Sequence, residues 1–239
     1  MIEYLLKNYK KIIFFSFYIF IILFDIALFK ENVMIWRREV FTLLLAFLYV
    51  FNISSDIENL MDSTRIVREK NRIKLVLRAN IANFKTASIF SIIYIIAIRI
   101  NHIFEIKRHI TGTMGEYTSN FFISSLLKLL AQVPGWLILG ELTIALFFLF
   151  KSRVLAIILT WGIVIITEGV QEKIAFLGIK KYIYSIYHNM FLGSDIGLKN
   201  FTLLEGFESI LKNCMLFFVI LAITCIILKR TDFLKRSLE

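Results

Sequence analysis

Ionisable side chains that interrupt long apolar stretches are the first candidates for chemistry in this 239-residue chain. They are Asp25, Arg99, Glu141 and Glu168. A charge inside hydrocarbon is costly, so such groups often mark a route for ions or polar substrates. The stretches that hold Glu141 and Glu168 are joined only by residues 151–153, which makes them antiparallel neighbours and places both carboxyls in the same outer half. Two carboxylates there would line an exit path for a cationic or amphipathic substrate.

Structural roles are the alternative for these groups. Glu141 would then form a hydrogen bond or an ion pair inside a helix bundle, with Lys128 or Arg99 as its partner. Asp25 and Glu168, near outer helix ends, would reach interfacial water. The structural role is favoured for Asp25 and Glu168, whereas both roles remain open for Glu141.

Sequence motifs of bond-making chemistry are missing from the chain. It holds no G-x-x-x-x-G-K-[ST] phosphate-binding loop, no H-E-x-x-H zinc motif and no G-x-S-x-G nucleophile motif. The three histidines, His102, His109 and His188, are scattered without metal-ligand spacing. An intramembrane hydrolase built on Glu168, Glu172 and His188 is the rival enzymatic hypothesis, but their spacing matches no motif. We therefore expect a non-catalytic chain with no metal and no cofactor of its own.

Composition and hydropathy predict the elements that position these groups. Apolar residues make up 58% of the chain, 24 residues are Phe, and the mean hydropathy is +0.75. A soluble domain of this size has no means to hide that much apolar surface. A helix needs roughly 20 apolar residues to cross a bilayer, and six stretches approach this length. We therefore predict an all-α polytopic membrane protein in which residues 1–239 form a single domain. The predicted crossings are residues 12–29, 38–55, 84–104, 133–150, 154–172 and 212–229.

Positive charge sets the expected orientation in the membrane. Lys and Arg collect in residues 1–11, 57–85, 151–153 and 229–236, which all face the cytoplasm if both termini do. We therefore predict a multi-pass protein of the cell membrane with both termini cytoplasmic. Anionic lipid headgroups are the natural counterpart of the net charge of +10, so no nucleic-acid partner is expected.

The N-terminal residues 1–11 carry apolar side chains at helical spacing, opposed by Glu3, Lys7 and Lys10. This pattern predicts a short helix that lies at the membrane interface, and an unstructured tail is the alternative. The apolar run that follows is too long for a secretory signal and lacks a cleavage site, so it is interpreted as an uncleaved first crossing.

The polar segment of residues 57–83 is the one long cytoplasmic segment that the pattern predicts. Its apolar residues recur at helical spacing on both sides of a polar break at residues 69–71. We expect two helices with a bend near residues 63–65, the second of which runs into the third crossing. One face of such a helix would press on a soluble partner, and the alternative is a basic helix lying on anionic lipid.

The layout as a whole resembles a known family. The interfacial helix, six crossings, an acidic-then-basic segment from Glu58 to Arg78 and the ending Lys229-Arg230-Thr231-Asp232-Phe233 are together similar to the permease subunits of ABC-2 type ABC transporters. The resemblance covers the whole chain. It implies that segment 57–83 is a coupling helix that docks on a separate ATPase subunit, where ATP and Mg are bound. The side chains that would face this ATPase are Asp62, Arg65, Arg68 and Glu69.

The same resemblance implies the partners and the cargo. Such a permease forms half of a translocation pathway in the lipid bilayer, pairs with a second copy or a sister permease, and binds two ATPase copies. Amphipathic peptides, antimicrobial peptides or drugs are the expected substrates. A substrate-capture subunit of a vitamin importer would lack the long coupling segment. A membrane scaffold or the intramembrane hydrolase would need no ATPase.

Two segments beside the predicted crossings leave alternatives open. Pro134 is expected in the first turn of the fourth crossing, and residues 119–132 before it form either an outer interfacial helix or an extension of that crossing across a kink. The family also implies short outer-leaflet helices within residues 177–211. Aromatic side chains there would anchor the segment among lipid headgroups or contact substrate. They are Tyr182, Tyr184, Tyr187 and Phe191.

Overall fold

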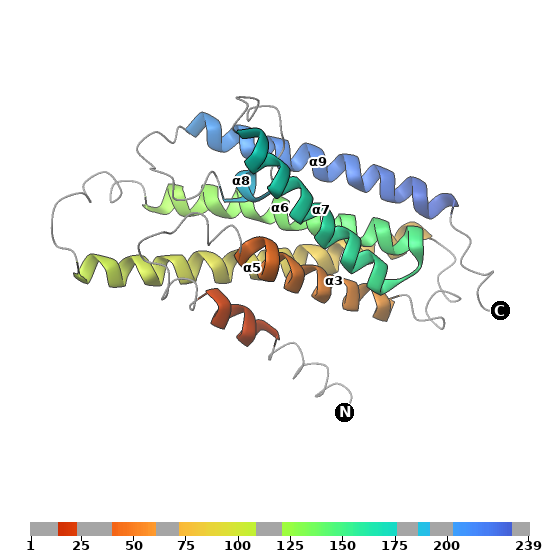
Figure 1. Ribbon diagram of the computed structural model, residues 1–239, viewed down its shortest axis with the longest axis horizontal. Helices are drawn as coiled ribbons and strands as arrows, with labels where there is room; N and C mark the ends of the chain where they lie inside the picture. Colours follow the sequence, from red (N-terminus) through yellow and green to blue (C-terminus); the bar gives the residue numbers. More distant parts are fainter. Residues whose placement is uncertain are drawn as a thin grey trace.

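The computed structural model describes residues 14–22, 40–60, 72–108, 121–175, 186–191 and 203–230, and these residues are almost entirely helical (Figure 1). Residues 14–22 form a helix. A π-helical turn, η1 (Phe41–Leu45), continues directly into α3 (Ala46–Leu60). The remaining helices are α5 (Arg72–Arg108), α6 (Phe121–Phe150), α7 (Arg153–Ala175), α8 (Ile186–Met190) and α9 (Leu203–Arg230).

Four of the helices are long and apolar enough to cross a membrane, counting only the described residues. Their apolar spans are Leu43–Leu60, Lys74–Ala97, Lys128–Phe150 and Phe207–Lys229. The all-helical architecture and its membrane character are therefore as predicted. The number of crossings stays a prediction, because the first stretch, 12–29, is described only over 14–22. The fifth stretch, 154–172, does lie on a helix, α7.

Helix α6 is the centre of the bundle. It contacts α3, α5, α7, α8 and α9, and 61% of its apolar span is buried, against 17% of the span of α9. A helix that is apolar all round suits such a central position, because every face meets another helix. The outer helices instead expose apolar side chains, as a lipid-facing surface does.

One end of the bundle brings together several chain segments that carry basic residues (Figure 1). Figure 1 shows the C-terminal end of α3, the N-terminal end of α5, the α6–α7 connection and the C-terminal end of α9 at the same end. We call this the α6–α7 end. Helices α3 and α5, which flank residues 61–71 in the sequence, therefore end and begin at the same end of the bundle and contact one another (Figure 1).

The connection between α6 and α7 is short and specific. Lys151 has φ 53°, a left-handed conformation that ends α6, and its N–H donates to the carbonyl of Phe147 at 2.8 Å. Ser152 then caps the next helix, since its Oγ accepts from the N–H of Leu155 at 3.4 Å. The two helices are therefore antiparallel neighbours, as the short link predicts.

Aromatic rings fill the core where α3, α5 and α6 meet. The Trp136 ring is fully buried, and its centroid lies 5.6 Å from Phe41, 4.7 Å from Tyr49 and 5.3 Å from Phe90. Tyr18 extends this aromatic core to the helix of residues 14–22, because its Oη donates to the Phe90 carbonyl at 3.1 Å. Offset and edge-on ring pairs of this kind stabilise beyond their buried area.

Two expectations about α6 are decided by the structure. Pro134 lies inside α6, which begins at Phe121, so the placement of Pro134 in the first helical turn is wrong. Residues 121–132 extend the crossing and do not form a separate interfacial helix. Pro134 has no N–H to donate to the Leu130 carbonyl one turn earlier, and beside that position Asn213 Nδ2 of α9 donates to the Ala131 carbonyl at 3.1 Å.

The described part of 177–211 is the short helix α8 and the start of α9. Tyr187 and Phe191 pack on Phe41 at centroid distances of 5.3 and 5.2 Å, and Phe191 is only 3% exposed. These two rings therefore belong to the core and do not serve as lipid anchors. The C-terminal end of α8 fits because Gly135 of α6 leaves room for the Met190 side chain.

The predicted continuity of segment 57–83 with the third crossing is confirmed on its second half. Helix α5 is 37 residues long and runs without a break from Arg72 through the predicted crossing. The bend at 63–65 and the interfacial helix 1–11 lie outside the described residues.

Candidate functional site

A buried carboxyl on the central helix is the strongest candidate for a functional site. Glu141 of α6 is 0% exposed, and its carboxyl lies against the side chains of Thr224 on α9 and Asn80 on α5. Neither neighbour forms a hydrogen bond of good geometry with it, and both carboxyl oxygens lack a partner among the described residues. We call Asn80, Glu141 and Thr224 the acceptor cluster.

Each of the two neighbours donates a hydrogen bond within its own helix. Asn80 Nδ2 donates to the Val76 carbonyl at 3.1 Å, and Thr224 Oγ1 donates to the Ile220 carbonyl at 2.9 Å. The Oδ1 of Asn80 is itself buried without a partner in the described structure. The carboxyl oxygens of Glu141 and the amide oxygen of Asn80 are therefore all buried without a hydrogen-bond partner among the described residues. An ionised carboxylate placed there without a counter-charge would cost several kcal/mol.

A second polar contact lies one turn away and holds α5 against α6. Asn83 accepts a hydrogen bond on Oδ1 from Tyr49 Oη at 2.6 Å and donates from Nδ2 to the Leu137 carbonyl at 3.1 Å. Gly140 makes this approach possible, because a Cβ at that position would overlap the Asn83 side chain. Small residues allow this kind of close helix contact inside membranes. The Asn83 contact therefore fixes the height at which Asn80 meets Glu141.

Glu168 occupies a different environment. It is 3% exposed, and its Oε1 accepts from the backbone N–H of Tyr187 at the start of α8, at 3.2 Å. The expectation that Glu168 reaches interfacial water is therefore wrong. Its carboxylate satisfies an N–H in the first turn of α8, where helical N–H groups have no partner in their own helix.

The two carboxyls lie against different helices in this conformation. Glu141 lies about 15 Å along α6 from Lys151, whereas Glu168 lies about 22 Å along α7 from Arg153. Glu141 faces the halves of α5 and α9 nearest the α6–α7 end, and Glu168 faces α8. A shared outer route for both carboxyls stays a prediction.

The ion-pair partners expected for Glu141 are also too distant. Lys128 is on the same helix, about 20 Å away along its axis, and Arg99 is about 28 Å along α5 from Asn80. A buried pair needs direct contact between the two charges. The bundle therefore encloses Glu141 without either partner.

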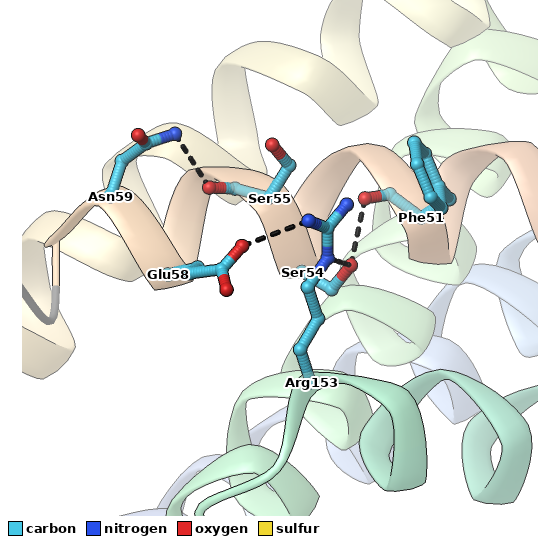
Figure 2. A network of polar contacts seen from close by, with 6 residues as sticks. All are labelled: Phe51, Ser54, Ser55, Glu58, Asn59 and Arg153. Atoms are coloured by element: carbon cyan, nitrogen blue, oxygen red, sulfur yellow. Dashed lines mark hydrogen bonds and ion pairs between the residues drawn. The ribbon is translucent and has the colours of Figure 1, made fainter.

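A third polar group joins the helices at the α6–α7 end, and Figure 2 shows it from close by. Arg153, the first residue of α7, donates from Nη1 to Glu58 Oε2 at 2.8 Å and from Nε to Ser54 Oγ at 3.3 Å. Its guanidinium also lies 4.7 Å from the centroid of the Phe51 ring. Ser54 Oγ in turn donates to the Phe51 carbonyl at 2.8 Å. We call this arrangement the Arg153 clamp, which ties the last turns of α3 to the start of α7.

The Arg153 clamp yields a modest stability prediction. We expect Arg153→Ala to lower the free energy of unfolding by about 1 kcal/mol, because the ion pair is partly exposed and the ring contact adds to it. The thermal midpoint of the protein in detergent measures this. Lys212→Ala is the control, since the Lys212–Glu208 pair lies within α9 alone and is worth less than about 0.5 kcal/mol. Equal midpoints for the two variants would contradict a clamp between α3 and α7.

Comparison with known proteins identifies no relative. No family model, no curated protein and no solved structure matches this chain significantly. The candidate sites are therefore argued from the described contacts themselves.

Sequence reasoning selected Glu141 and missed its surroundings. Asn80, Asn83 and Tyr49 contribute to the site through contacts between helices, and an Asn in an apolar stretch is the signal that could have pointed to them. The residues expected to face an ATPase lie outside the described part of the chain, and so does Asp25. Those residues are Asp62, Arg65, Arg68 and Glu69. Among the described residues, no cluster of His, Cys, Asp and Glu suited to a metal is found.

Proposed function

We propose that this chain is the permease subunit of an ABC-2 type exporter. The observation that supports the proposal best is that α3 ends and α5 begins at the α6–α7 end, on either side of segment 61–71 (Figure 1). Helices α3 and α5 flank this segment and contact one another, and the Arg153 clamp joins α3 to α7 beside it. A soluble partner that moves segment 61–71 would therefore move several bundle helices together.

The proposed mechanism is a movement of rigid helices with no bond chemistry in this chain. ATP binding closes a pair of partner ATPases, and the ATPases push on the two coupling segments of a permease dimer. The force enters α3 and α5 directly, and it reaches α7 through Arg153 and Glu58. The bundle then changes between two packed arrangements, as transporters with rigid domain movements do.

The proposed assembly contains two permeases, either two copies of this chain or this chain with a sister permease, and two ATPase chains that bind ATP and Mg. The apolar surface of α7 and α9 suits contact with lipid. Amphipathic peptides, antimicrobial peptides or drugs are the proposed cargo, because the chain is small and apolar. The protein resides in the cell membrane with the α6–α7 end and both termini in the cytoplasm.

Co-purification tests this function. The permease is expressed with each free-standing ABC ATPase of the same genome, and the complex is purified in mild detergent by a tag on the permease. We expect one ATPase to remain bound to the wild type and to be lost in the double variant Arg65→Glu plus Arg68→Glu, because charge reversal places repulsion in the docking surface.

The control reverses the same number of charges at Lys180 and Lys181, which are predicted to lie on the outer side. This variant should retain the ATPase, and both variants should elute as folded protein in size-exclusion chromatography. If no ATPase binds the wild type under conditions that preserve known ABC complexes, the exporter proposal fails.

A further inference from the structure

We propose that Glu141 is a proton-binding site inside the bundle: its carboxyl is protonated in this conformation and donates a hydrogen bond to Asn80 Oδ1. The proposal rests on the contacts of the acceptor cluster. It does not depend on the exporter function. Proton binding is the chemistry that the cluster needs, since a single O–H donor pairs the carboxyl with the orphaned amide oxygen.

The orientation of the Asn80 amide is fixed by its own helix. The Val76 carbonyl accepts from Asn80 Nδ2 at 3.1 Å, so turning the amide over would place two oxygens against each other. Asn80 Oδ1 therefore has to face away from Val76, and it is buried without a donor among the described residues. Thr224 is unable to supply one, because its hydroxyl proton is committed to the Ile220 carbonyl. Glu141 is the neighbour that can provide the donor, and only in its protonated form.

Among the described residues, no cationic side chain takes the place of the proton. Described charged side chains on the helices packed against α6 face outward or belong to other contacts. On α5 and α9 they are exposed, and on α3 and α7 they lie in the Arg153 clamp, near the end of α3, or at the start of α8. These groups are Lys74, Arg78 and Lys85 on α5, Glu208, Lys212 and Lys229 on α9, Asp56 and Glu58 on α3, and Arg153 and Glu168 on α7.

Because the Glu141 carboxyl is enclosed by the bundle, its protonation is coupled to the packing of the helices. Glu141 has no exposed surface, so water reaches its carboxyl only if α5 or α9 separates from α6. Release of the proton would leave an unpaired carboxylate among acceptors, which disfavours the closed packing. The protonated state therefore belongs to the closed bundle, and an open arrangement is needed for exchange.

Infrared spectroscopy of the whole protein in an ester-free detergent tests the proposal at neutral pH. Exposed carboxylates are ionised there, so a protonated buried acid contributes a separate carbonyl-stretch band above the amide I band. In wild-type protein labelled with ¹³C-glutamate we expect this band to shift to lower wavenumber. We expect Glu141→Gln to remove the band, and Glu168→Gln, the matched control at the other buried acid, to retain it.

Two further variants keep the test decisive. Glu141→Asp retains an acid at the site, but the band should then no longer shift with ¹³C-glutamate. This variant takes the place of Glu141→Gln in the test if Glu141→Gln does not fold. Asn80→Ala should move the band to higher wavenumber, because the carboxyl loses its hydrogen-bond acceptor. Absence of an isotope-sensitive band from the folded wild type, or a band that Glu141→Asp leaves sensitive to the label, overturns the proposal. A band unchanged by Asn80→Ala overturns the assignment of Asn80 as the acceptor.

Discussion

Replacing Gly140 by Val is expected to destabilise the bundle by about 2 to 5 kcal/mol. Atoms added at Gly140 would overlap Asn83, whose amide is held between Tyr49 Oη and the Leu137 carbonyl. The substitution overpacks the contact between α5 and α6, which costs about 1 to 3 kcal/mol. It also displaces a buried amide from its partners, at a similar cost.

The loss should appear as a thermal midpoint in detergent lowered by on the order of 10 °C. Gly162→Val is the matched control, because no atom lies within 4 Å of a Cβ built at Gly162 on α7. Both changes replace a helical glycine by the same residue, so helix propensity acts equally on the two variants. A similar drop for both would show that Gly140 is not needed for close packing against Asn83.

Trp136→Ala is expected to cost about 3 to 5 kcal/mol, the range for truncating a large buried ring. The Trp136 ring is fully buried and contacts Phe41, Tyr49 and Phe90. Its removal leaves a cavity between α3, α5 and α6. The three surrounding rings belong to separate elements, so they do not move together to fill that space. The thermal midpoint and the yield of monodisperse protein in detergent measure the effect.

Trp161→Ala provides the comparison for this aromatic core. Trp161 is half-buried on α7 and packs against Phe47 at a centroid distance of 5.5 Å. Its truncation removes a ring of the same size from the periphery, so we expect a loss well below that of Trp136→Ala. If the two variants unfold at the same temperature, the aromatic core does not dominate the stability of the bundle.

The acceptor cluster and the Arg153 clamp lie in the same half of the bundle. Glu141 is about 15 Å from the α6–α7 connection along α6, and Arg153 stands at that connection. A displacement of α3 would act on Arg153 directly, and a displacement of α5 would move Asn80, which is on α5. In the proposed exporter, a partner that displaces α3 and α5 would therefore act on the half of the bundle that holds Glu141.

Hydropathy by itself determined the fold class. Long apolar stretches predict membrane-crossing helices because every backbone group must be satisfied within the segment. The antiparallel pairing of α6 and α7 was also readable, since residues 151–153 leave no room for another arrangement. Glu141 was identified because a carboxyl in an apolar stretch is costly wherever that stretch is buried.

The partners of those residues were decided by tertiary structure alone. An apolar helix shows no preferred face in its sequence, so the pattern could not tell that Glu141 meets Asn80 and Thr224, or that Glu168 meets Tyr187. The Arg153 clamp could not be predicted from the sequence for a related reason, since Arg153 and Glu58 are 95 residues apart in the chain. Composition sets which segments leave water, whereas the rotation and height of each helix follow from side-chain contacts between segments, such as Asn83 against Gly140.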